Sequence, residues 1–264
     1  MPIAIRLPVL LVAISGCAHG RPAAPDPVAM QRSLARVLLD HRAFDQAVMP
    51  LRALLSRRPD DAEAHTMLGV VYRERGLFAA AEEELVRAAR LDAGAAAPRA
   101  ELALTYDRAG RRDDAIAEHR LAIARAPEVS SYRNNLGWSL VLAGRPAEAI
   151  AALQQALEAD PSSRRARNNL GFALGRKGDI DGAARAFADA GPPAEAANNL
   201  GLLYEAKGDR ARACEAYAEA VALDAELAVA TRNRKRLCGA RDRAVLPALN
   251  LPDAPPRIAT EDAP

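Results

Sequence analysis

The hydrophobic positions of this chain recur with the spacing of short amphipathic helices that come in pairs. In most segments, apolar residues stand at i, i+3, i+4 and i+7, which places them on one side of a helix. The pattern then breaks, and a second helical segment follows with a small residue near its start. Arginine (Arg42) occupies the break in the first pair. Glycine occupies it in the other five: Gly76, Gly110, Gly144, Gly178 and Gly208. Because glycine readily adopts the positive φ that ends a helix, each break predicts a tight turn between two helices.

A string of six residues shows that these pairs are copies of one unit. Arg-Asn-Asn-Leu-Gly-Trp at 133–138 returns as Arg-Asn-Asn-Leu-Gly-Phe at 167–172 and as Ala-Asn-Asn-Leu-Gly-Leu at 197–202. The first two copies are 34 residues apart, and the same step leads back to Leu-Ala or Leu-Gly pairs at 102–103, 68–69 and 34–35. A constant step of this length predicts an array in which each helical hairpin buries its apolar face against its neighbours.

The six units resemble the tetratricopeptide repeat. The resemblance rests on the Leu-Gly or Leu-Ala pair of the first helix, on the alanine of the second, and on the prolines that close three units, Pro59, Pro127 and Pro161. It implies an all-α, right-handed superhelical solenoid with a concave groove lined by the first helices. We assign the units to residues 28–61, 62–95, 96–129, 130–163, 164–193 and 194–227, followed by a capping helix at 228–239. The fifth unit is shorter by four residues, so we expect a different stacking angle there.

The first 17 residues have the character of a secretion signal. Arg6 precedes an apolar run at 7–14 that is too short to span a bilayer. The run ends in Ile-Ser-Gly-Cys, which resembles a bacterial lipobox, and the resemblance implies cleavage before Cys17 and lipidation of that residue. An ordinary signal peptide beside a buried cysteine is the alternative. Ala18 stands where aspartate would suggest retention in the inner membrane, which favours an outer-membrane anchor facing the periplasm.

Two segments flank the array. Residues 18–27 are rich in proline and predict an extended tether, and the proline-rich residues 240–264 predict a mostly disordered tail. Between array and tail, the two other cysteines lie on helices that should pack together, Cys214 in unit 6 and Cys238 in the capping helix. In an oxidising compartment such a pair suggests a disulfide, although two small buried side chains that never meet would also fit.

The charge and the scattered histidines argue against several classes of function. The formal net charge is +2, from 36 Lys and Arg against 34 Asp and Glu, which argues against a nucleic-acid binder with a broad basic face. The four histidines lack the spacing of metal ligands, and no nucleophile motif is found. We therefore predict no metal, no cofactor and no enzymatic activity.

The asparagine pairs and the residues that follow them are the candidate groove residues. By resemblance to the family, the second asparagine of each pair is structural, and the first points into the groove, at Asn134, Asn168 and Asn198. One turn further along the same helices stand Trp138, Phe172 and Leu202. Amides could hold a peptide backbone while the larger side chains accept apolar anchors, and Arg108 and Arg176 could meet acidic groups at the groove edge. For Trp138 a second interpretation is equally open, in which the side chain fills a gap between repeats and does not face the groove.

The combined layout resembles the outer-membrane tetratricopeptide lipoproteins of pilus and secretion systems, which include the secretin pilotins of type IV pili and the TadD proteins of Flp pili. The resemblance implies a non-enzymatic adaptor that binds a secretin or pilus component and supports its assembly. A scaffold that gathers peptidoglycan hydrolases and proteases, like NlpI, is one alternative. An accessory subunit of an envelope enzyme is another.

Overall fold

The computed structural model describes residues 26–239, and this part of the chain folds into thirteen α-helices. The first twelve form pairs: α1 (Pro27–Asp40) with α2 (Phe44–Arg57), α3 (Ala62–Glu74) with α4 (Phe78–Leu91), α5 (Ala97–Arg108) with α6 (Arg112–Arg125), α7 (Ser130–Leu142) with α8 (Pro146–Ala159), α9 (Arg164–Lys177) with α10 (Ile180–Ala190), and α11 (Pro193–Ala206) with α12 (Arg210–Leu223). The single helix α13 (Ala228–Cys238) follows. The predicted all-α repeat solenoid is confirmed. The signal segment with Cys17, most of the tether and the tail lie outside the described residues.

Two helices begin one residue before the predicted unit boundary. Helix α1 starts at Pro27 and α11 at Pro193, each with proline at its first position. Proline is favoured there because its φ is already helical and the first N–H of a helix has no intrahelical partner. In α1 the side chain of Asp26 also caps the helix by accepting a hydrogen bond from the Val28 N–H at 3.0 Å.

The breaks inside the pairs are the tight turns that the sequence predicts. The five glycines have φ between 71° and 105°, and Arg42 adopts the same conformation in the first unit with φ of 57°. At Gly144, the backbone N–H of Arg145 donates to the Leu140 carbonyl at 2.9 Å, and that of Gly144 to Val141 at 3.1 Å. These bonds satisfy carbonyls that the end of α7 would leave unpaired.

The glycine of the Leu-Gly pair has a different role, which is close contact between the two helices of a unit. A Cβ atom added at Gly137 would lie only 2.5 Å from Cγ of Leu153, a residue of the second helix. Any larger residue there would push α7 and α8 apart, so the repeated glycine follows from packing rather than from a turn.

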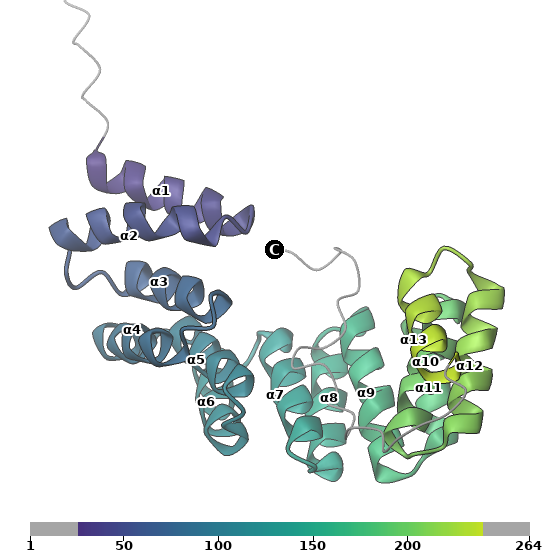
Figure 1. Cartoon of the computed structure of the whole chain (residues 1–264). Coiled ribbons are helices and arrows are strands. Elements are labelled where there is room, and N and C mark those ends of the chain that lie inside the picture. The colour runs from purple at the N-terminus through teal and green to yellow at the C-terminus, as the bar shows by residue number, and fades with distance from the viewer. Residues whose placement is uncertain (1–25, 240–264) are drawn as a thin grey trace, which may run out of the picture.

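The pairs stack side by side into an open arc, with α1 at one end and α13 at the other (Figure 1). Each second helix packs against the first helix of the next unit, and first helices also contact one another, most extensively α7 with α9. Helix α10 has 11 residues where the other second helices have 14, because Gly191 and two prolines end it early. The altered stacking angle expected from this shortening stays a prediction.

The hydrophobic interior forms separate clusters along the arc. In units 1 and 2 the core is mostly aliphatic, with Leu51, Leu54 and Val71 fully buried. In units 4 and 5 the core is built around aromatic rings, those of Trp138, Phe172 and Phe187. The two large clusters share no residue, and a smaller one around Leu85, Leu102 and Tyr106 lies between them.

Candidate partner-binding face

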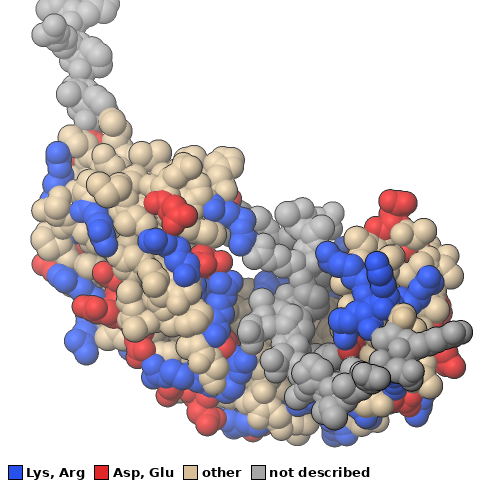
Figure 2. All heavy atoms as spheres, viewed as in Figure 1, with Lys and Arg blue, Asp and Glu red and all other residues tan. Residues whose placement is uncertain are grey.

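The first helices of the units, with α13, form a surface that we call the inner face. These helices contact one another along the array, so they lie on the shorter side of the arc, which is concave. Figure 2 shows the open space between the two ends of the arc. The interactions between neighbouring first helices therefore decide which side chains remain available to a partner.

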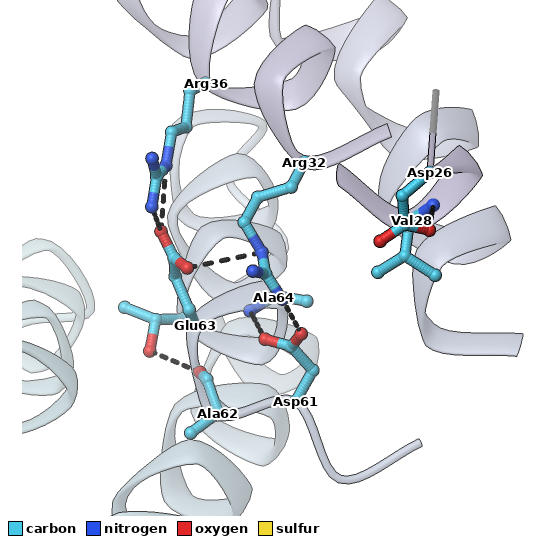
Figure 3. Close-up of polar contacts among 9 residues, drawn as sticks. Asp26, Val28, Arg32, Arg36, Asp61, Ala62, Glu63 and Ala64 are labelled. Carbon is cyan, nitrogen blue, oxygen red and sulfur yellow. Dashed lines mark hydrogen bonds and ion pairs between the residues drawn. The ribbon is translucent and has the colours of Figure 1, made fainter. Parts of the chain in front are cut away.

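In the first units, neighbouring first helices are joined by arginine–carboxylate pairs. Figure 3 shows Arg32 and Arg36 reaching from α1 to the start of α3. Arg32 pairs with Asp61 and lies 3.4 Å from Glu63, and Arg36 donates from Nε to Glu63 at 2.9 Å. Asp61 also caps α3 by accepting from the Ala64 N–H at 2.9 Å. One carboxylate thus starts a helix and binds the preceding unit.

The same type of contact joins units 2 and 3. Arg73 of α3 pairs with Glu101 of α5, and Arg108 of α5 reaches back to Glu74 with a nitrogen–oxygen distance of 3.0 Å. Burial opposes the charge on Arg73, but Glu101 and Glu74 outweigh it, and the pKa of this guanidinium is raised. Arg108 of the first helix α5 therefore already has an acidic partner within the chain, and its predicted role at the groove edge stays a prediction.

In the later units, a ladder of buried amides replaces the ion pairs. In units 5 and 6 the second asparagine donates through Nδ2 to Oδ1 of the first asparagine one unit earlier, and Asn233 of α13 does the same to unit 6. The three rungs are Asn169 to Asn134 at 2.9 Å, Asn199 to Asn168 at 2.6 Å, and Asn233 to Asn198 at 3.0 Å. The last rung joins unit 6 to α13, so the ladder continues into the capping helix.

The ladder corrects the prediction that the first asparagine of each pair faces the groove. Asn134, Asn168 and Asn198 are only 4 %, 4 % and 5 % exposed. Their carbonyl oxygens are occupied by the amide of the next unit, since the first helices approach closely enough for the side chains to bond directly. These residues hold repeats together and are not available to a peptide.

The aromatic residues one turn further on also lie in the interior. Trp138 is 3 % exposed and Phe172 is fully buried. The Trp138 and Phe172 rings meet edge to face with centroids 5.8 Å apart, and Phe172 meets Phe187 in the same way at 4.9 Å. Of the two interpretations left open for Trp138, the structure supports the gap between repeats, and the groove assignment of both aromatic residues is wrong.

The other predicted groove residues remain at the surface. Leu202 is half-buried and Arg176 is exposed at the end of α9, where the described part of the chain provides no ion pair for it. Leu202 has two counterparts at the same position of earlier units, Val70 and Leu104, which are also half-buried. The inner face thus offers partly exposed aliphatic side chains with arginines near them.

A buried carboxylate between units 3 and 4 was not predicted. Asp107 is 4 % exposed, accepts a hydrogen bond from the Ser139 hydroxyl, and lies 3.3 Å from Nε2 of His119. Arg112 adds a guanidinium nitrogen 3.5 Å from its other oxygen. Although serine, histidine and aspartate meet here, Ser139 and His119 are both fully buried, and Asp107 lies between them. No substrate can reach the hydroxyl, so we assign the cluster to joining the units.

A similar cluster joins unit 6 to α13. The Tyr217 hydroxyl donates to Glu205 at 2.7 Å, and Arg236 of α13 donates to the same carboxylate at 2.7 Å. Burial opposes the ionisation of Glu205, but the bonds from Arg236 and Tyr217 prevail and lower its pKa. Burial and the bond to Glu205 raise the pKa of Tyr217, so the pair stays as carboxylate and phenol near neutral pH.

The capping helix is also held covalently. Cys214 of α12 and Cys238 of α13 form a disulfide in the structure, as the sequence predicted, closing a loop with a sequence separation of 24. Within residues 26–239, no group of three or more histidine, cysteine or acidic residues could hold a metal ion, and no helix is both long and apolar enough to cross a membrane.

The stacked hairpins, glycine turns and capping helix define a helical-repeat solenoid. Models of the tetratricopeptide repeat match residues 32–98, 100–164 and 135–192, and a further one matches 194–227. These matches span well over half of the sequence, so the chain belongs to the tetratricopeptide repeat family. Such repeats generally bind protein or peptide partners, and the proteins that contain them are generally adaptors or scaffolds rather than enzymes. No curated protein sequence matches the chain.

Solved structures share the fold. PilF of Pseudomonas aeruginosa has a TM-score of 0.61 at 22 % identity, with 80 % of this chain and 97 % of that one covered. YrrB, described as having an unusual peptide-binding site, has a TM-score of 0.52 at 23 % identity, covering 70 % and 97 %. MamA has a TM-score of 0.53 at 24 % identity, covering 62 % and 90 %. Identities this low show a common architecture.

Proposed function

We propose that the chain is a lipid-anchored periplasmic adaptor whose inner face holds a segment of a protein partner during assembly of an envelope complex, such as a pilus or a secretin. The anchor is Cys17, and the expected location is the outer membrane. The fold shared with PilF and the lipobox-like sequence support this proposal, and the inner face supplies the binding surface.

The observation that carries the binding proposal is the row of aliphatic side chains left on the inner face. Val70, Leu104 and Leu202 occupy the same position in units 2, 3 and 6 and remain half-buried, whereas Trp138 and Phe172 fill that position in units 4 and 5 and are buried. Side chains that are partly exposed on a concave surface lose their remaining water contact when a partner docks, which favours binding.

Arginine accompanies this row and indicates what a partner should carry. Arg108 follows Leu104 by one helical turn, and Arg176 is exposed at the end of α9. When a protein partner binds, Arg108 would exchange its ion pair with Glu74 for one with an acidic group of the partner. Arg176 would instead gain an ion pair that it lacks within the described residues. A helical or extended segment with apolar residues and a carboxylate would therefore match the face.

Photocrosslinking in cells tests the proposal directly. A photoreactive residue at Leu104 should capture a secretin or pilus protein, whereas the same residue at the exposed Leu223 of α12 should not. Capture of a wall hydrolase or protease would favour the scaffold alternative. An empty inner face, with the partner captured at Leu223 instead, would contradict the assignment of the site.

Charge reversal provides a second measurement on the same surface. Arg176→Glu should weaken capture at Leu104 while lowering stability by no more than about 0.3–1 kcal/mol, the effect of an acidic residue in the last turn of a helix, since no intramolecular ion pair is described for Arg176. The anchor has its own test: Cys17→Ser should leave folding intact and release the protein from membranes. A variant that still sediments with membranes after a high-salt wash would remove the main support for the anchor.

A further inference from the structure

Helix α1 carries a row of exposed apolar side chains on the side that faces away from the array. Met30, Leu34 and Val37 are 56 %, 46 % and 50 % exposed. They stand at i, i+4 and i+7, so they follow one another along a single side of the helix. None of them contributes to the described hydrophobic cores, although Ala35 of the same helix is fully buried.

The repeat shows what this side of a first helix normally does. The residues equivalent to Val37 in units 2 to 6 are all buried, with exposed fractions of 0 % or 1 %: Val71, Thr105, Ser139, Ala173 and Leu203. The residues equivalent to Leu34 in units 2, 3 and 4 are 2 %, 2 % and 9 % exposed: Leu68, Leu102 and Leu136. In each case the preceding unit covers them, and α1 has no preceding unit among the described residues.

The other end of the array is closed differently. In α13 the equivalents of Met30 and Val37 are Ala230 and Leu237, and both are buried against unit 6. Apart from Val229, which is 38 % exposed, the outer surface of α13 is mostly polar, with exposed arginine and lysine side chains. Terminal repeats need a polar outer face to remain soluble. The C-terminal end meets this requirement, whereas the N-terminal end presents the apolar stacking surface of an ordinary internal unit.

We propose that the Met30, Leu34 and Val37 face docks on the lipid surface of the membrane that carries the anchor. This inference rests on the proposed lipidation of Cys17. Nine residues, 18–26, separate Cys17 from the first residue of α1. Fully extended, they reach at most roughly 30 Å, so an anchored chain keeps this end of the array close to the bilayer.

A lipid surface fits the row better than a second copy of the chain does. A stable protein interface takes roughly 20–30 residues on each side, and the exposed apolar row has three. Contact with lipid needs no such complementarity, and the short tether gives it a high effective concentration. A contact too weak to hold two freely diffusing molecules together can therefore persist between the α1 row and the bilayer to which the chain is anchored.

The charges around the row indicate that the contact is apolar rather than electrostatic. Arg32 and Arg36, the basic residues of α1, turn to the acidic residues at the start of α3 (Figure 3). Asp26 and Asp40, at the two ends of the helix, are exposed and would not attract anionic headgroups. The contact should consequently survive high salt. Since the docked face is the end of the stack, the later units extend away from the membrane with the inner face open.

The test places the photoreactive residue p-benzoylphenylalanine at Leu34 of the full chain in its native membrane. The sample is illuminated in about 1 M salt, where charges more than about 3 Å apart are screened from one another. Under these conditions we expect an adduct between the Leu34 position and lipid. The matched control carries the same residue at Leu223, which is 53 % exposed at the opposite end of the array, and should give no lipid adduct. Val37→Ser should markedly reduce the Leu34 lipid adduct while the chain still sediments with membranes.

The other outcomes overturn the proposal in distinguishable ways. An adduct of twice the chain mass at Leu34 would assign the row to self-association, and an adduct with a different protein would assign it to a partner. No adduct from a chain that sediments with membranes would refute lipid docking and leave the anchor intact. If the unmodified chain does not sediment with membranes at all, the anchor and the docking face both fail.

Discussion

The first three units and the last three are built on the same helix pair but are joined to their neighbours by different interactions. In units 1 to 3, arginine–carboxylate pairs link the first helices, and several of them are open to water: Arg36 and Glu63 have side chains 59 % and 41 % exposed. In units 4 to 6, buried amides make the same connection, with Asn169 fully buried. The cores differ in parallel, mostly aliphatic in the first region and aromatic in the second.

This difference affects how firmly each region holds its shape. An exposed ion pair contributes about 0–1 kcal/mol and tolerates rearrangement, because water replaces either partner. A buried amide that loses its partner costs about 1–3 kcal/mol, because no water reaches it. We therefore expect the first region to adjust its curvature more easily, while the amide ladder keeps units 4 to 6 and α13 in one register. The region with the partly exposed Val70 and Leu104 is then the more adaptable one.

The largest expected effect comes from removing the aromatic centre of the second region. Trp138→Ala should lower the free energy of unfolding by about 3–5 kcal/mol, since it leaves a cavity beside Phe172. Because a solenoid transmits contacts mainly to nearest neighbours, hydrogen exchange should accelerate in α7 to α10 and change little in α1 to α3.

Leu54→Ala is the matched control in the first region, where Leu54 is also fully buried. It should accelerate exchange in α1 to α4 and spare α9 to α12. Equal acceleration along the whole array in either variant would mean that the two regions unfold as one. The difference in their interactions would then produce no difference in their local stability.

Reduction of the disulfide comes next in size. Removing the Cys214–Cys238 bond by Cys238→Ser should lower stability by about 3 kcal/mol, on the usual loop-entropy argument. The effect should be local, because α13 remains attached through the Asn233 rung, the Arg236 pair, the bond from Arg210 to the Leu237 carbonyl and its small core. Limited proteolysis should then cut near α13 before any other helix. A melting curve of the unmodified protein that is identical with and without reductant would contradict this expectation.

The sequence predicted the repeat register and the turns because both follow from local requirements. Glycine or a tolerant residue must occupy a position of positive φ, and Gly137 leaves the space that Leu153 fills. No comparable local requirement determines where the side chains of two successive asparagines point. Whether Asn134 faces a partner or the next repeat depends on how tightly first helices approach, and that distance arises from the curvature of the whole stack.

One signal for the ladder was nevertheless present. Asn233 stands 34 residues after Asn199, so the asparagine position continues into the capping helix, which lies outside the six predicted units. Its presence there indicates a contact between helices. The buried Asp107 had a weaker signal. Its position varies between units, with Arg73 in unit 2 and Glu205 in unit 6, but His119 replaces the leucine or aromatic residue of the other units. A histidine at an otherwise apolar position points to a polar contact in that unit.

A smaller effect distinguishes the two kinds of joint. Asn134→Ala should destabilise by about 1–3 kcal/mol, because the Asn169 amide is left buried without its acceptor. Arg36→Ala, which removes an exposed pair with Glu63, should change stability by less than about 1 kcal/mol. Chemical denaturation of both variants measures the difference, and raising the salt should diminish only the Arg36 effect. If the two variants are equally destabilised, the ladder is no firmer than the ion pairs.

The smallest expected effect is a gain in stability at the turn of the first unit. Arg42 occupies a conformation with φ of 57° that the other units give to glycine. Its side chain lies 5.5 Å over the Phe44 ring and 3.8 Å from Glu74, both modest contacts at an exposed position. Arg42→Gly should raise stability by about 1 kcal/mol, because the left-handed conformation is strained for a residue with a Cβ atom.

Two further variants separate the backbone from the side chain. Arg42→Ala loses the same contacts but keeps the strain, so it should melt below the unmodified protein while Arg42→Gly melts above it. Gly76→Ala, in the turn of unit 2 where φ is 75° and no atom lies within 4 Å of the added Cβ, should be destabilised by about the amount that Arg42→Gly gains. If Arg42→Gly melts no higher than Arg42→Ala, the side-chain contacts and not the φ value determine the stability of the first turn.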